Sequence, residues 1–154
     1  MSQLQDRTLQ YYRQQQCQPG WFDLLSVIID GMMSNAGERE SQAFLQQMGD
    51  SLAGRYPLGK AATVGDLETQ INQVLARFNW GFIDIQPSGN AMIIEHLALP
   101  VAEGALPLHH WHLALSAVLT GLYARWIREQ GGYDRVSLSV EATSDVSLRF
   151  RYQA

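Results

Sequence analysis

The stretch LHHWHLALSAVLTGLYARWIREQGG, residues 108–132, decides the fold that this sequence predicts. Its apolar residues recur at the three- and four-residue spacing of a helix, and Gly131-Gly132 is a helix stop, so we expect a long helix from about Leu108 to Gln130. The apolar residues follow two stripes rather than one. The first stripe holds Leu115, Leu119, Leu122 and Trp126, and the second holds Leu113, Ala117, Thr120, Ala124 and Ile127.

The second stripe of this helix needs a cover of its own. One domain easily buries a single apolar stripe of a helix, which leaves the other for a partner helix. Ala117 and Gly121 are small enough to let two helices approach closely. We therefore predict that the chain self-associates through this helix. The residues expected at the contact between copies are Leu115, Leu119, Leu122, Tyr123 and Trp126.

Four segments before the long helix have patterns of their own, three of them clearly helical. Residues 1–19 are rich in glutamine with weak periodicity, and we expect a weak helix or an ordered arm. Residues 21–33 are apolar on nearly every side, which predicts a buried helix. Residues 38–55 predict a helix with one apolar stripe, and residues 63–79 predict a helix that begins with a capping-box pattern. The stripe of the 38–55 helix consists of Phe44, Leu45, Met48 and Leu52.

The pattern changes from helical to extended in two places. Residues 82–94 contain the turn Pro87-Ser88-Gly89-Asn90 between two apolar runs, which predicts a β-hairpin. Residues 136–152 alternate apolar and polar side chains on both sides of a turn, which predicts a second hairpin. Helices, hairpin, long helix and hairpin in this order favour an α+β fold with one antiparallel sheet covered on one side. We expect one domain over residues 1–154, with 1–19 as a possible arm.

The composition excludes several classes of function. With 46% apolar and 17% charged residues, the chain has too much apolar surface for a disordered protein and little charge to coat a monomer, which indicates buried interfaces. The net charge is −4, and no dense cluster of Lys or Arg is present, so we expect no nucleic-acid binding. Cys17 is the lone cysteine, which excludes an intrachain disulfide and a thiolate metal cluster.

Two groups of side chains invite a chemical interpretation. His109 and His112, with His110 between them, share a helix face at the spacing of metal ligands, but the sequence offers no third ligand. Asp84 and Glu95 lie on opposite strands of the first hairpin, as a glycosidase pair would, although two solvated acids are far commoner there. No nucleophile elbow, phosphate loop or dinucleotide motif occurs. We expect no catalytic residue, cofactor or metal.

Three segments resemble the D-subunit family of bacterial cellulose synthase. They are LARFNWG at 75–81, IIEHLALP at 93–100 and VLTGLYARW at 118–126, of which the last is the most specific. The resemblance covers roughly Phe44 to Tyr152. The order of the elements is also more distantly similar to small vinyl-reductase-type domains. That second similarity gives an alternative: a sensory or binding module with a small apolar ligand between the long helix and the sheet.

The family resemblance implies a non-catalytic accessory subunit that forms a cylindrical homo-octamer and promotes crystalline cellulose. It implies two partners, the membrane-bound cellulose synthase complex and a proline-rich cellulose-complementing protein. Two mechanisms stay open, a conduit whose passageways guide β-1,4-glucan chains and a scaffold that aligns the synthases. Because the sequence shows no signal peptide and no membrane span, we expect the cytoplasm near the inner membrane, with the periplasm as the alternative.

The N-terminal arm carries the residues that suit a sugar chain. In the family the N-terminal region lies near the passageways. The candidates for facing glucan are Gln3, Gln5, Tyr11, Tyr12 and Arg13. Their amides, phenols and guanidinium match sugar hydroxyls, although a glutamine-rich arm is more often simply solvated.

Overall fold

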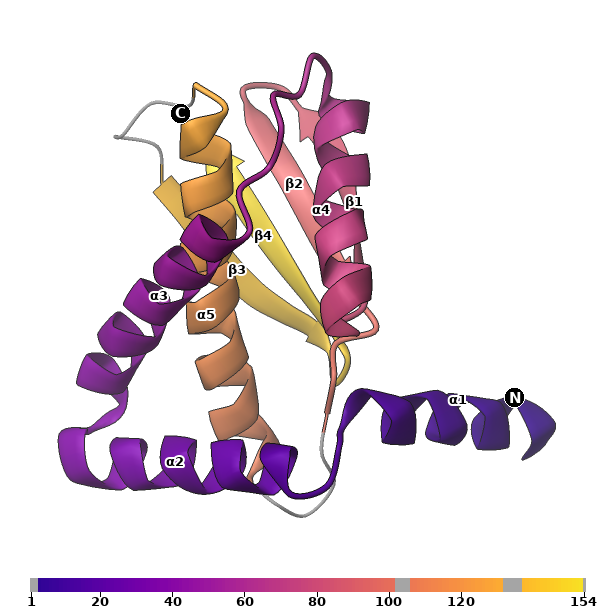
Figure 1. The fold of residues 1–154 in the computed structure, drawn as a ribbon, viewed down its shortest axis with the longest axis vertical. Coiled ribbons are helices and arrows are strands. Elements are labelled where there is room, and N and C mark those ends of the chain that lie inside the picture. Colours follow the sequence, from indigo (N-terminus) through magenta and orange to yellow (C-terminus); the bar gives the residue numbers. More distant parts are fainter. Residues whose placement is uncertain (1–2, 102–105, 132–136, 154) are drawn as a thin grey trace.

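The computed structural model describes residues 3–101, 106–131 and 137–153, and its elements follow the order expected from the sequence (Figure 1). The α+β class is confirmed. Gly132 and Val136, which we assigned to the helix stop and the second hairpin, lie outside the described residues. Among the described helices, none combines the length and hydropathy needed to cross a membrane. The helices are α1 (Gln3–Gln16), α2 (Trp21–Ala36), α3 (Glu38–Arg55), α4 (Val64–Phe78) and α5 (Leu108–Glu129), and the strands are β1 (Phe82–Ser88), β2 (Ala91–Leu97), β3 (Ser137–Ser144) and β4 (Ser147–Gln153).

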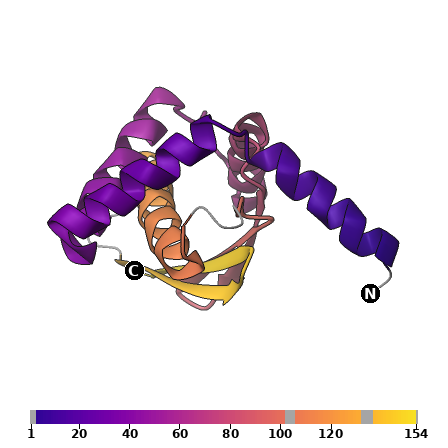
Figure 2. The same cartoon turned by 90° about the horizontal axis from the view of Figure 1, so that it is seen from below.

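The two hairpins form one antiparallel sheet with the strand order β1-β2-β4-β3. Side chains alternate between its faces, and Ile83, Ile94 and Phe150 lie on the face that α4 and α5 cover. The opposite face is polar, with Glu95 of β2 in register with Arg149 of β4. Seen from below, α2, α3, α4 and α5 lie on one side of the sheet, whereas α1 projects away beyond it (Figure 2). The sheet therefore has one core face and one open face.

Helix α5 is the centre of the core, and its partner helix is α3 of the same chain. The two backbones touch where they cross. A Cβ atom on Gly49 of α3 would lie 1.9 Å from the carbonyl oxygen of Val118, and a Cβ atom on Gly121 of α5 would lie 1.9 Å from that of Gln46. The sequence correctly indicated a close helix approach at Gly121. The helix that approaches comes from this chain, so α5 is covered by the sheet on one side and by α3 on the other.

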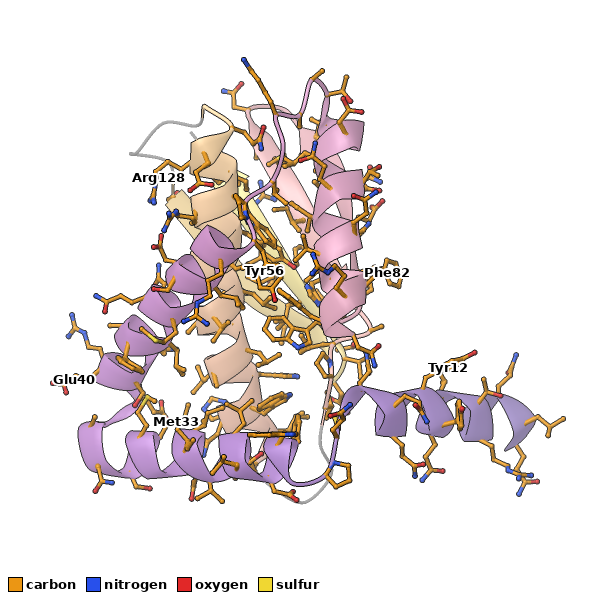
Figure 3. The ribbon with its side chains drawn as sticks, in the orientation of Figure 1. Tyr12, Met33, Glu40, Tyr56, Phe82 and Arg128 are labelled. Carbon is orange, nitrogen blue, oxygen red and sulfur yellow. The ribbon has the colours of Figure 1, made fainter. Side chains whose placement is uncertain are left out.

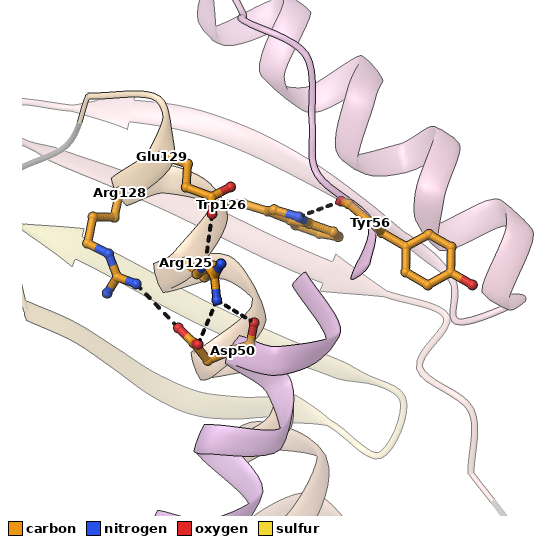
Figure 4. Close-up of polar contacts among 6 residues, drawn as sticks. All are labelled: Asp50, Tyr56, Arg125, Trp126, Arg128 and Glu129. Atoms are coloured by element: carbon orange, nitrogen blue, oxygen red, sulfur yellow. Dashed lines mark hydrogen bonds and ion pairs between the residues drawn. The ribbon is translucent and has the colours of Figure 1, made fainter. Parts of the chain in front are cut away.

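Polar contacts hold the same crossing from its edge (Figure 4). Asp50, the residue after Gly49, accepts from Arg125 at 2.9 Å and from Arg128 at 3.3 Å. These pairs are partly exposed, so solvent screens them and their contribution to stability is small. The Trp126 indole is buried and donates to the carbonyl oxygen of Tyr56 at 2.9 Å. This bond ties the last turn of α5 to the end of α3.

Two of the predicted helices bury different faces than expected. Helix α2 was predicted to be buried, but only Ser26, Ile29 and Met33 are buried. In α3 the predicted stripe is half wrong, because Phe44 and Met48 are exposed. The face of α3 that packs is lined instead by small residues around Leu45. They are Ser41, Gly49 and Ala53, which let the helix reach the backbone of α5.

We expect Gly49→Ala to destabilise the chain, because the added methyl group meets backbone that cannot rotate away. Because the methyl group meets backbone, the overpacking cost lies at the upper end of its usual range, about 3 kcal/mol, and the helix propensity gained is about 1 kcal/mol, so the net loss should be about 2 kcal/mol. Urea unfolding followed by circular dichroism measures it. Gly65→Ala in α4 is the matched control, since its Cβ would lie 3.7 Å from Thr63 Oγ1 and should be neutral or stabilising. Equal midpoints for the two variants would contradict the close crossing.

Candidate functional site

The residues predicted to contact a second copy lie inside the fold. Leu119, Leu122, Tyr123 and Trp126 are at most 1% exposed and Leu115 is 7% exposed. The sheet and α3 cover them within one chain. None of the five presents a surface to another copy, so the structure corrects this prediction. A contact between copies has to use another part of the surface.

One such part is the outer side of α2, which we call the α2 surface. While Ile29 and Met33 point into the body (Figure 3 labels Met33), the other side of the helix is apolar and faces solvent. Packing of Phe22 on Trp111, with ring centroids 4.8 Å apart, fixes how the helix is rotated. Helix α2 thus has two apolar sides and the chain covers only one. The residues of the α2 surface, with their exposed fractions, are Trp21 (75%), Leu24 (50%), Leu25 (42%), Val27 (68%) and Ile28 (50%).

Helix α1 projects from the body as an arm, as Figures 1 and 2 both show. It buries no residue. Two hydrogen bonds tie its last turn to the body: Gln16 Nε2 donates to the carbonyl of Ala98 at 2.7 Å, and Asn79 Nδ2 donates to the carbonyl of Gln15 at 3.0 Å. An isolated helix of this length is only marginally stable in water, so α1 gains from any molecule that packs along it.

A groove of about 350 Å³ lies where the arm leaves the body, and we call it the α1 groove. Two rings, Tyr12 and Phe82, are among its walls, and Figure 3 labels both. Phe82 begins β1 and is 50% exposed, although it is a large apolar ring. The residues that line the α1 groove include Leu9, Tyr12, Arg13, Gln16, Asn79 and Phe82.

The structure separates the five residues predicted to face glucan. Tyr12 and Arg13 line the α1 groove, whereas Gln5 and Tyr11 line shallower hollows along α1 and Gln3 lines none of these. The rings of Tyr11 and Tyr12 meet edge to face at 5.7 Å. Sequence reasoning missed the other wall of the groove, Asn79 and Phe82, because nothing local links these residues to the arm.

A buried histidine joins the sheet to α5. His96 of β2 is fully buried, with Nε2 2.6 Å from the carbonyl oxygen of Trp80 and Nδ1 2.5 Å from the hydroxyl oxygen of Tyr123. A carbonyl only accepts, so Nε2 carries the proton and donates, and Tyr123 donates to Nδ1. Burial lowers the pKa of His96 to about 4, against a smaller opposing effect of the Trp80 carbonyl. Burial also raises the pKa of Tyr123, so both groups stay neutral at pH 7.

Two of the three other histidines contact different elements. His112 Nε2 donates to the carbonyl of Asp145 at 2.8 Å, while His110 lies 3.7 Å from Glu38 at the start of α3. Within the described ranges no three metal-ligating side chains come together. These contacts fasten the start of α5 to the second hairpin and to α3.

The two remaining alternatives find no support in the geometry. Asp84 and Glu95 do lie opposite each other, but on the open face of the sheet, where Glu95 accepts from Arg149 at 2.5 Å. The space between α5 and the sheet, where a small apolar ligand was the alternative, is filled by aromatic side chains. Tyr123 and Phe150 pack there with centroids 5.2 Å apart.

We expect the stability of the chain to fall on acidification because of His96. Its pKa is about 4 in the fold and about 6.5 in an unfolded chain, so the unfolded state binds the proton between these values. The contribution of neutral His96 to the free energy of unfolding is complete above about pH 6.5. It falls by about 1.4 kcal/mol per pH unit between there and about pH 4. Urea unfolding at several pH values measures this slope. His96→Gln keeps a donor and an acceptor but cannot titrate, and an identical slope in that variant would contradict the assignment.

Comparison with known proteins agrees with the resemblance seen in the sequence. A family model for the D subunit of cellulose synthase matches residues 7–153. Relatives named cellulose synthase operon protein D, from Komagataeibacter xylinus and Komagataeibacter sucrofermentans, are each 36% identical over 100 residues, which is 63% of this chain and 62% of each relative. The match therefore spans less than two thirds of the length of these relatives. Because the family model extends from α1 to the end of β4, the chain belongs to the D-subunit family of cellulose synthase.

Proposed function

We propose that the chain is a non-catalytic, self-assembling accessory subunit of bacterial cellulose synthesis. Its family and the relatives' name, cellulose synthase operon protein D, connect it with cellulose synthesis. The observation that carries the assembly is the α2 surface. Its five exposed side chains amount to roughly 500 Å² of apolar area, which is as large as the patches that mark interaction sites.

A second copy is the occupant that this area favours. A stable interface buries about 800 Å² on each side, and the α2 surface supplies more than half of that from one helix. Because the five side chains of the α2 surface are all apolar, two copies of α2 packed across a two-fold axis match without placing charge against these side chains. The polar side of the helix, which carries Asp23 and Asp30, stays at the edge of such a contact.

The finer features of the family resemblance belong to the same proposal. They are a cylindrical homo-octamer, located in the cytoplasm near the inner membrane, that aligns membrane-bound synthases with the help of a proline-rich partner. The α2 surface supports the assembly step. The location, the number of copies and the proline-rich partner stay predictions, and light scattering, fractionation and pull-down experiments each test one of them.

We expect Ile28→Glu to dissociate the assembly, because a carboxylate buried in an apolar contact costs several kcal/mol. Absolute mass by light scattering after size exclusion measures it. Ser34→Glu adds the same charge on the exposed polar side of α2 and should leave the mass unchanged. Circular dichroism checks that both variants remain folded. A wild-type monomer, or an Ile28→Glu variant of unchanged mass, would remove the α2 surface from the assembly.

The α1 groove favours a second activity of the same subunit, contact with β-1,4-glucan. Tyr12 and Phe82 provide flat apolar rings, and the amides of Gln16 and Asn79 with the guanidinium of Arg13 provide groups that pair with sugar hydroxyls. A glucan chain along α1 would also bury part of a helix that now buries nothing. We propose that the arm and the groove hold one glucan chain.

We expect Tyr12→Ala to weaken the binding of cello-oligosaccharides at least tenfold, since it removes one wall of the groove. Titration calorimetry or NMR shift perturbation measures the affinity. Tyr11→Ala is the control, because Tyr11 is as exposed as its neighbour but does not line this groove. Equal losses in both variants would show that the arm binds glucan without the groove, and no binding by the wild type would refute the glucan proposal.

A further inference from the structure

The two edges of the sheet differ in what covers them. Strand β1 is shielded by two side chains of α4. Asn72 accepts from the backbone N–H of Ile83 at 2.7 Å and donates to its carbonyl at 3.0 Å, and Glu68 accepts from the N–H of Ile85 at 2.8 Å. A side-chain amide that hydrogen-bonds both the backbone N–H and the backbone carbonyl of one residue takes the place of a neighbouring strand. Edge β1 is therefore closed to further pairing.

Among the described residues, none covers strand β3 in this way. Within the part of the chain that the structure describes, only β4 pairs with it, so alternate backbone groups along Ser137–Ser144 point away from the sheet unpaired. Sheet edges are usually protected by Lys, Pro or a bulge. Strand β3 contains no Lys or Pro, and its bulge lies at the far end, between Ala142 and Ser144. Residues 137–142 form a regular, open edge.

We propose that β3 pairs antiparallel with β3 of a second copy and joins two sheets into one of eight strands. The inference rests on the proposed self-assembly and adds a second contact to it. A single two-fold contact closes at a dimer, so an assembly larger than a dimer needs another one. The α2 surface and the β3 edge are separate elements. Two different two-fold contacts whose axes intersect generate a closed ring with an even number of copies.

Side-chain chemistry selects the register of this pairing. Directly opposite residues of two antiparallel strands have their side chains on the same side of the sheet. The two-fold axis must therefore lie level with a residue of β3, and not between two consecutive residues. An axis at Glu141 would oppose two carboxylates, which is unfavourable. An axis at Val140 pairs Val140 with its copy and Leu138 with Ala142 on the core side. It also places Glu141 opposite Ser139 of the second copy.

Charge favours the register at Val140. Ser139 is paired in its own chain with Arg151, which is exposed and makes no ion pair among the described residues. In the proposed pairing Arg151 reaches past Ser139 to Glu141 of the other copy. Glu141 contacts Arg149 of its own chain only at 3.4 Å, so it has capacity for a second guanidinium. Because the pairing has two-fold symmetry, the contact between Arg151 of one copy and Glu141 of the other forms twice.

Opposite charges at position 139 test the inference. Ser139→Glu pairs with Arg151 within the chain but opposes Glu141 of the second copy, so we expect a folded variant whose mass falls to that of a dimer held by α2. Ser139→Lys opposes the same Glu141 with the opposite charge and should keep the full mass. Ser139→Glu combined with Ile28→Glu should give a monomer. The masses are measured by light scattering, with circular dichroism as the check of folding.

The outcomes separate this inference from the proposed function. If Ile28→Glu lowers the mass and Ser139→Glu does not, self-assembly stands and the β3 contact is refuted. If both charges at position 139 dissociate the assembly, the register at Val140 is wrong. A wild-type monomer refutes the proposed self-assembly itself.

A disulfide tests the axis directly. Directly opposite residues of an antiparallel pair have Cα atoms about 4.5–5.5 Å apart, within the range of a disulfide. In a Cys17→Ser background, Val140→Cys should form a covalent dimer on mild oxidation. Ala142→Cys, which would lie far from its own copy in this register, should not. Cross-linking of Ala142→Cys alone would overturn the register.

Discussion

The contact between the backbones of α3 and α5 is the constraint on which the rest of the structure depends. Gly49 and Gly121 let each helix touch a carbonyl oxygen of the other, and no larger side chain fits at either position. Because α3 lies this close, it covers the stripe of α5 that faces away from the sheet. Every large apolar residue in the middle of α5 is then used inside one chain. Helix α2, which precedes α3 in the chain, packs against α3 and α5 near the end of this crossing. Its outer side is apolar and exposed.

The same contact marks how far the sequence predicted the fold. Periodicity, caps and turns are local properties, so every element and the order of the elements were predictable, including both ends of α3. Which helix covers the second stripe of α5 is not local. Gly121 indicated that some helix comes close, but it carries no information on whether that helix belongs to the same chain. Gly49 was the overlooked signal, since a glycine inside a helix costs about 1 kcal/mol and is explained by close packing.

The candidate site was predictable only on one side. The arm and two of its groove residues, Tyr12 and Arg13, follow from their composition and position in the sequence. The opposite wall comes from residues more than sixty positions away, Asn79 and Phe82, which the fold alone brings to the arm. The sequence places His96 in a hairpin and carries no sign of its partners. Its role depends on Trp80 and Tyr123 meeting it from two other elements, and no pattern in the sequence encodes that meeting.

The division between core and surface leaves three separate surface features for the proposed contacts. The buried polar bonds of His96 and the crossing at Gly49 hold the body without help from a second copy. The α2 surface, the β3 edge and the α1 groove share no residue and rest on different elements of that body. Changes at sites without shared contacts usually add independently. The proposed assembly through α2, the proposed pairing through β3 and the proposed contact with glucan are therefore three properties that substitutions can test separately, each on an otherwise intact fold.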